Sequence, residues 1–136
     1  MFRKQANKPQ NRIDSLIGAG TKIEGNVSFA GGLRVDGEVK GNVTATGDQP
    51  STLVVSEQAR IDGEIRVSHL VVNGAINGPV FSAEFLELQA HSRVKGDVHY
   101  NSLEMHLGAV VEGRLVHASS AIETGKTVGL KIASRN

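Results

Sequence analysis

The chain has 136 residues, a formal net charge of +1, no cysteine, no tryptophan, and one tyrosine beside four phenylalanines. This length predicts one domain, in which valine, isoleucine and leucine must build the core. The absence of cysteine excludes disulfides and thiolate metal sites. Because the longest apolar runs have three residues, we expect neither a membrane-spanning segment nor a signal peptide.

The net charge conceals two basic ends on an acidic middle. Residues 1–13 carry four basic and no acidic side chains, and residues 121–136 carry three basic side chains against one acidic. This leaves 8 of the 15 basic and 13 of the 14 acidic side chains for the middle of the chain. Basic ends on an acidic body indicate an anionic surface as the partner of the ends, and no nucleic acid is expected on the body.

The two ends also differ from the middle in composition. Residues 1–13 are rich in amides and contain Pro9, and we predict a disordered basic arm there. Residues 121–136 are predicted to form a C-terminal tail, although the apolar alternation over residues 128–132 could add a strand. The folded domain is expected to span residues 14–120.

Six copies of one short pattern recur between these ends: an apolar residue, any residue, glycine, any residue and an apolar residue. The copies are Ile23–Val27, Val35–Val39, Ile61–Ile65, Val72–Ile76, Val94–Val98 and Val111–Leu115. Ahead of them lie Leu16, Leu33, Leu53, Leu70, Leu86 and Leu103, at steps of 17, 20, 17, 16 and 17 residues. A fixed period of this length is typical of a solenoid, in which each unit buries its apolar face against the next copy.

Two of the six repeats are compressed. In the second and fourth repeats the glycine comes sooner after the leucine, and a second glycine follows at Gly41 and Gly78. We interpret these glycines as corners between short strands, where a positive φ or a close neighbouring backbone excludes Cβ. The one long step contains residues 44–51, a turn-forming cluster that predicts a loop bulging from a corner.

Coils of 16 to 17 residues with several short strands each predict an all-β fold, a single-stranded parallel β-helix of about six rungs. The spacing between neighbouring strands gives a rod roughly 29 Å long. Inward side chains are expected to stack on their equivalents in the neighbouring coils. The core is then a column of aliphatic ladders with no room for a cofactor.

A β-helix raises the possibility of an enzyme. Hexapeptide-repeat acyltransferases and the related carbonic anhydrases are left-handed β-helices, and residues 16–27 look like two of their repeats. The likeness does not continue, because those helices need an aliphatic residue at every sixth position. An enzyme of this class, with its active site formed between subunits, is the alternative function.

Residues suited to catalysis or metal binding do not fall into a recognisable constellation. The five histidines occupy five different places in the repeat, so we expect surface histidines and no ligand cluster. The acids that recur before the motif glycine share their position with Asn73 and Lys95, which predicts a solvated corner. Gly125-Lys126-Thr127 lacks the upstream glycines of a phosphate loop. We therefore predict no catalytic residue, no metal site and no cofactor.

The repeats resemble those of the bactofilins, which are bacterial cytoskeletal proteins. The likeness covers about residues 14–120 and is carried by the stretches 23–27, 35–43 and 61–65. It implies a right-handed β-helix, triangular in section, that assembles end to end into filaments without a nucleotide. It also implies attachment to the inner face of the cytoplasmic membrane and a scaffolding role for cell-wall enzymes and cell shape.

The two ends of the stack are the predicted polymerisation interface. Terminal coils of a solenoid normally carry polar caps or a covering helix, and no amphipathic capping helix is recognised on either side of the repeats. The residues expected in the contact are Leu16, Ile17, Ile23, Leu103, Met105, Leu107, Val110, Val111 and Leu115. We expect the chain to polymerise with copies of itself, and the alternative is a monomer whose tails fold over its ends.

The arm opens with Met1, Phe2, Arg3 and Lys4, which is similar to the membrane-targeting segment of many bactofilins. Burial of Phe2 and part of Met1 in a lipid interface could supply about 3 kcal/mol, and each basic residue about 1 kcal/mol near anionic lipid. A sum near 6 kcal/mol corresponds to an affinity of only about tens of micromolar, so binding is expected to depend on the avidity of a polymer. The alternative is a charged start that serves solubility.

Overall fold

The computed structural model describes residues 13–118. The predicted arm and tail lie outside the described residues. The strands are β1 (Ser15–Ile17), β2 (Lys22–Glu24), β3 (Val27–Phe29), β4 (Gly32–Val35), β5 (Glu38–Lys40), β6 (Val43–Ala45), β7 (Thr52–Val55), β8 (Arg60–Asp62), β9 (Ile65–Val72), β10 (Ala75–Asn77), β11 (Val80–Leu88), β12 (Arg93–Lys95), β13 (Val98–Tyr100), β14 (Ser102–Met105), β15 (Val110–Glu112) and β16 (Leu115–His117).

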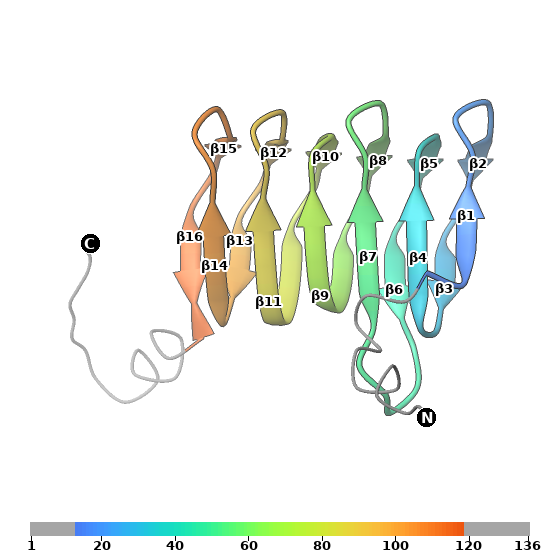
Figure 1. The fold of residues 1–136 in the computed structure, drawn as a ribbon, viewed down its shortest axis with the longest axis horizontal. Coiled ribbons are helices and arrows are strands. Elements are labelled where there is room, and N and C mark those ends of the chain that lie inside the picture. The colour runs from blue at the N-terminus through green and yellow to red at the C-terminus, as the bar shows by residue number, and fades with distance from the viewer. Residues whose placement is uncertain (1–12, 119–136) are drawn as a thin grey trace, which may run out of the picture.

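The strands stack into a solenoid of six coils, each with three sides (Figure 1). Coil 1 holds β1–β3, coil 2 holds β4–β6, and coil 6 holds β14–β16. Between them, β9 closes coil 3 and opens coil 4, and β11 closes coil 4 and opens coil 5. All strand pairs are parallel. The predicted all-β parallel β-helix of about six coils is therefore confirmed, and its right-handed sense stays a prediction.

Aliphatic ladders fill the interior, as the alternation predicted. Leu33, Leu53, Leu70, Leu86 and Leu103 lie in register on successive coils. A second ladder on the next side is formed by Val39, Ile61, Ile76 and Val94, and all of these side chains except the half-buried Leu103 are buried. The ladder side chains pack together with their equivalents in the neighbouring coils, so the coils stabilise one another by burial of apolar surface.

Coil 1 departs from the predicted leucine ladder. Ser15 pairs with Leu33, and Leu16 pairs with the outward-facing Arg34. Leu16 is consequently 61% exposed on the side of the rod. The prediction that Leu16 opens the ladder is wrong, because a shift of one residue moves a strand side chain to the opposite face. The signal was present, since the motif glycine follows Leu16 by nine residues and not by ten as in the repeats at Leu53, Leu86 and Leu103.

One corner of the rod is a column of glycines. The column consists of Gly25, Gly41, Gly63, Gly78, Gly96 and Gly113. Gly63 has a φ of +157°, and a Cβ there would lie 2.1 Å from the carbonyl oxygen of Gly41. In coils 2 and 4, which hold the two compressed repeats, this corner is therefore turned by the second glycine, Gly41 or Gly78. Gly37 and Gly74 turn a different one, between β4 and β5 and between β9 and β10. The pattern of five residues therefore marks two kinds of corner, which the sequence alone had merged.

The predicted loop is the longest connection between described strands. β6 ends at Ala45 and β7 begins at Thr52, so the loop itself covers residues 46–51. It projects beyond the ends of the neighbouring strands (Figure 1). Within residues 13–118, no helix is long and apolar enough to cross a membrane.

Candidate assembly ends and side-face clusters

The C-terminal end of the rod exposes the last members of the aliphatic ladders. Met105 and Leu115 extend ladders from coil 5 and are each 44% exposed. Leu103 and Val111 extend the two other ladders and are half-buried. Coil 6 is the last coil of the described chain, and no described residue packs on its far side as a seventh coil. These four predicted contact residues therefore share one open apolar end.

Two other predicted contact residues of coil 6 point elsewhere. Val110 pairs with the exposed Arg93 on the outer face of β12. Leu107 lies in the turn between β14 and β15 and is 95% exposed. Both therefore lie on the side or the corner of the last coil and not in the continuation of its core.

The N-terminal end is less apolar than the C-terminal end. Ile17 is buried, and Ile23 is half-buried in the end coil. Ser15 replaces the ladder leucine, and Asp14 accepts a hydrogen bond from Gly32 N through Oδ2 (3.0 Å). Of the three N-terminal residues predicted in the contact, the structure thus places Ile17 and Ile23 in the end coil's core and Leu16 on its side.

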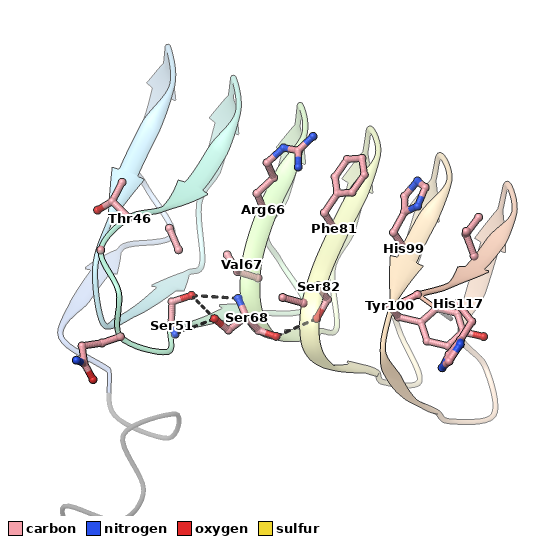
Figure 2. Close-up of a pocket in the computed structure, with 16 residues that line it drawn as sticks. Thr46, Ser51, Arg66, Val67, Ser68, Phe81, Ser82, His99, Tyr100 and His117 are labelled. Atoms are coloured by element: carbon pink, nitrogen blue, oxygen red, sulfur yellow. Dashed lines mark hydrogen bonds between the residues drawn. The ribbon is translucent and has the colours of Figure 1, made fainter. Parts of the chain in front are cut away.

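A groove of about 550 Å³ runs along one corner of the rod, from the 46–51 loop to coil 6 (Figure 2). Its wall carries a stack across coils 3 to 5. The Arg66 guanidinium lies 4.0 Å from the Phe81 ring centroid, and the Phe81 and His99 rings stack with centroids 4.4 Å apart. Of the described residues that line the groove, none is an aspartate or a glutamate. Sequence reasoning missed this groove, because the stack depends on the coil register.

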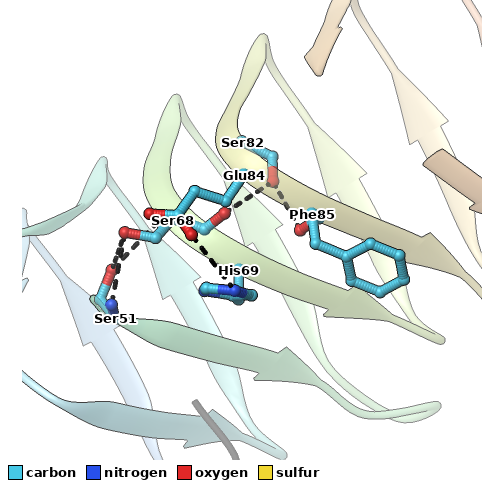
Figure 3. Close-up of polar contacts among 6 residues, drawn as sticks. All are labelled: Ser51, Ser68, His69, Ser82, Glu84 and Phe85. Carbon is cyan, nitrogen blue, oxygen red and sulfur yellow. Dashed lines mark hydrogen bonds and ion pairs between the residues drawn. The ribbon is translucent and has the colours of Figure 1, made fainter. Parts of the chain in front are cut away.

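The floor of the groove meets a polar corner that holds Ser51, Ser68 and Ser82 (Figures 2 and 3). The Ser51 and Ser68 hydroxyl oxygens are 3.4 Å apart, and the Ser82 hydroxyl lies 2.7 Å from the Phe85 carbonyl oxygen. His69 Nε2 lies 3.6 Å from Glu84 Oε1, while its buried Nδ1 has no hydrogen-bond partner. A nucleophilic serine needs a base within hydrogen-bond reach. The three hydroxyls here bond to one another or to backbone groups.

A second cluster lies on another side of the last two coils and joins His106 to Glu87 and Glu104. The prediction of no ligand cluster rested on the different repeat positions of the five histidines and on the acids before the motif glycine. It did not consider a histidine beside acids on a neighbouring coil. The cross-coil pairing of Glu87 with Glu104 follows from the step of 17 residues between Leu86 and Leu103. That step is the signal by which the cluster could have been found.

Charge pairs also link coils at the glycine corner. Arg114 N donates to Asp97 Oδ1 and Arg114 Nη2 to Asp97 Oδ2, both at 3.0 Å. The side-chain hydrogen bond from Arg114, followed by the backbone one, holds the pKa of the Asp97 carboxyl below its ordinary value. Asp36 lies at the other corner, between β4 and β5. A hydrogen bond from Ser56, and then one from Arg34, lowers the pKa of its carboxyl.

Comparison with known proteins decides the family. The family model described as "Bactofilin: Polymer-forming cytoskeletal" matches residues 15–116. The chain belongs to the bactofilin family. Bactofilin BacO of Myxococcus xanthus (strain DK1622) is 24% identical over 102 residues, which cover 75% of this chain and 78% of that protein. No solved structure gives a significant match.

The matched region of this bactofilin begins with β1 and ends within β16, so it covers all six coils of the solenoid. It contains the glycine corner, most of the groove and both end coils. The family is a structural one, so the chain is described as a polymer-forming cytoskeletal protein. The predicted membrane-binding residues Met1, Phe2, Arg3 and Lys4 lie outside the described residues, and their role stays a prediction.

Proposed function

We propose that this bactofilin assembles end to end into filaments through its terminal coils. The observation that carries the proposal is the open apolar end formed by Leu103, Met105, Val111 and Leu115. The same ladders are buried in coils 2 to 5, because another coil covers them there. A second copy stacked on coil 6 would bury this surface in the way that a seventh coil would.

Leu115→Arg tests this proposal, because Leu115 is one of the four residues of the open end and is already 44% exposed in the isolated chain. A charge placed in the contact is expected to cost several kcal/mol and to leave short, soluble species. Glu57→Arg is the control, since it places an arginine on an exposed turn of coil 3, away from both ends. Electron microscopy and sedimentation should show filaments for the control only. Long filaments of a folded Leu115→Arg protein would place the interface elsewhere.

Assembly is proposed to need neither a nucleotide nor a metal. The sequence contains no phosphate loop, and the apolar ends supply the driving force without a ligand. Purified protein should therefore form filaments in a chelating buffer without ATP or GTP. A strict requirement for either would contradict the proposal.

The arm is proposed to hold the filaments on the inner face of the cytoplasmic membrane, where they position cell-wall or cell-shape proteins. Phe2 beside Arg3 and Lys4 combines an apolar side chain with unopposed positive charge. Phe2→Glu, or deletion of residues 1–8, should release filaments from anionic liposomes without changing their assembly, and salt should weaken wild-type binding. If the truncated protein still sediments fully with liposomes, the basic tail with Lys126 and Lys131 becomes the next candidate.

A further inference from the structure

Coils 5 and 6 carry a small array of ligand-type side chains on one outer face. Glu87 on β11 pairs directly with Glu104 on β14, and His106 follows Glu104 by two residues on the same face. His106 Nε2 lies 2.9 Å from Glu87 Oε2 and 3.1 Å from Glu104 Oε2. Gln89 completes the array, and its Nε2 donates to Glu87 Oε2 at 3.3 Å.

The charges in this array are unbalanced, in contrast to those of four carboxylates elsewhere on the rod. Like charges directly opposite each other on neighbouring strands are destabilising. Four other carboxylates, those of Asp36, Asp62, Glu64 and Asp97, each pair with an arginine. Among the described residues, Glu87 and Glu104 share only His106 as an ion-pair partner. Two negative charges therefore face one imidazole, which carries at most one positive charge.

The geometry suits a divalent cation. One ligand atom from each of Glu87, Glu104 and His106 lies within 4.8 Å of the others. Ligands about 2.0–2.2 Å from a tetrahedral zinc ion are about 3.3–3.6 Å apart, so small side-chain movements would bring all three to one ion. An imidazole nitrogen favours Zn²⁺ and its first-row neighbours over Mg²⁺ and Ca²⁺, which prefer oxygen ligands alone.

We propose that Glu87, Glu104 and His106 bind a divalent transition-metal ion of the zinc class, with a solvent molecule in the fourth position. A neutral His106 acts as a ligand, and the ion neutralises both carboxylates. Gln89 orients Glu87 by its hydrogen bond, as an outer-shell partner of a metal ligand does. The ion would join coil 6 to coil 5 within one chain. It would thus stabilise the one coil that has a neighbour on only one side at this end of the rod, and filament assembly itself would not require it.

Zinc titration of the untagged full chain, freed of metal by a chelator, tests the site directly. Isothermal titration calorimetry should show one Zn²⁺ per chain and no comparable binding of Mg²⁺. His106→Gln should weaken zinc binding by more than about tenfold, and so should Glu87→Gln. The matched control is His91→Gln, because His91 is also exposed but lies near a single carboxylate, 3.8 Å from Glu57. This control should bind zinc as the wild type does.

Two further measurements separate a zinc ion held by these three side chains from zinc bound loosely at scattered surface groups. X-ray absorption of the zinc-loaded protein should show one imidazole ligand, and zinc should raise the melting temperature of the wild type but not of His106→Gln. The Leu115→Arg protein should retain the site whether or not it forms filaments, because all three ligands belong to one chain. Absence of saturable binding, equal affinity in His106→Gln, loss of binding in His91→Gln, or loss in Leu115→Arg would each overturn the proposal.

Discussion

The two ends of the rod are built from the same ladders but present different surfaces. At the C-terminal end, Met105 and Leu115 remain nearly half exposed. At the N-terminal end, Ile17 and Phe29 are only 8% and 9% exposed, and Ser15 replaces a ladder leucine. The interior of the solenoid thus determines which aliphatic ladders run through the rod. The departures of the terminal coils from the repeat determine how much apolar surface each end offers to a partner.

The largest expected effect comes from charging the two ends at matched positions. Leu115 and Val27 are the two ends of one ladder, whose inner members are Val43, Ile65, Val80 and Val98. Leu115→Arg should abolish long filaments, because an arginine there would be buried without a partner at a cost of about 3–5 kcal/mol. Val27→Arg should shorten filaments less, since this end offers less apolar surface. Sedimentation and electron microscopy of both variants provide the comparison.

Circular dichroism of each variant, together with its hydrodynamic size, controls for folding. Equal loss of filaments in both variants would show that the two ends contribute equally to the contact. A uniform population of dimers in Leu115→Arg would show that junctions join like ends, whereas monomers would show that every junction uses coil 6.

The second prediction compares the end of the glycine corner with its middle. A Cβ at Gly63 would lie 2.1 Å from the Gly41 carbonyl oxygen, whereas a Cβ at Gly25 in coil 1 meets nothing within 4 Å. Gly63→Ala should therefore cost about 3 kcal/mol or more. Gly25→Ala carries backbone strain alone, at φ +139°, and should cost about 1 kcal/mol.

Denaturant midpoints of the two glycine variants should be measured in the Leu115→Arg background, so that assembly contributes equally to both. If Gly25→Ala is as damaging as Gly63→Ala, the close approach of the stacked backbones is not what selects glycine here. Backbone conformation would then account for the whole column.

The repeat period was enough to predict the fold, and it failed where one coil departs from the others. The leucine steps correctly predicted strands and parallel stacking, because every coil must bury the same ladders. Leu16 was misplaced because a single-residue shift reverses a strand's faces. Gly37 and Gly74 turn corners, as predicted, but not the same corner as the other motif glycines, because both kinds of corner join two strands through two residues that include a glycine. Prediction of the groove and of the Glu87 cluster would have required the coil-to-coil register, which those ambiguities obscured.

The smallest expected effect concerns the contacts that tie each end coil to its neighbour at the glycine corner. At the N-terminal end the tie is neutral, because Asn42 N donates to Asn26 Oδ1 at 2.8 Å. At the C-terminal end it is ionic, between Asp97 and Arg114. The lowered pKa of Asp97 means that its stabilising contribution is complete above the ordinary aspartate pKa of about 3.9 and is lost as the pH falls through the lower folded value.

Acid should therefore loosen coil 6 before coil 1. Amide hydrogen exchange, corrected for its intrinsic pH dependence, should show the protection of Arg114 N falling between about pH 5 and pH 2, while the protection of Asn42 N changes little. Asp97→Asn keeps an acceptor for Arg114 N but removes the titrating charge, so its protection should be lower at neutral pH and nearly independent of pH. If Arg114 N and Asn42 N lose protection together in the wild type, the ends do not differ in this contact. The acid response would then belong to the rod as a whole.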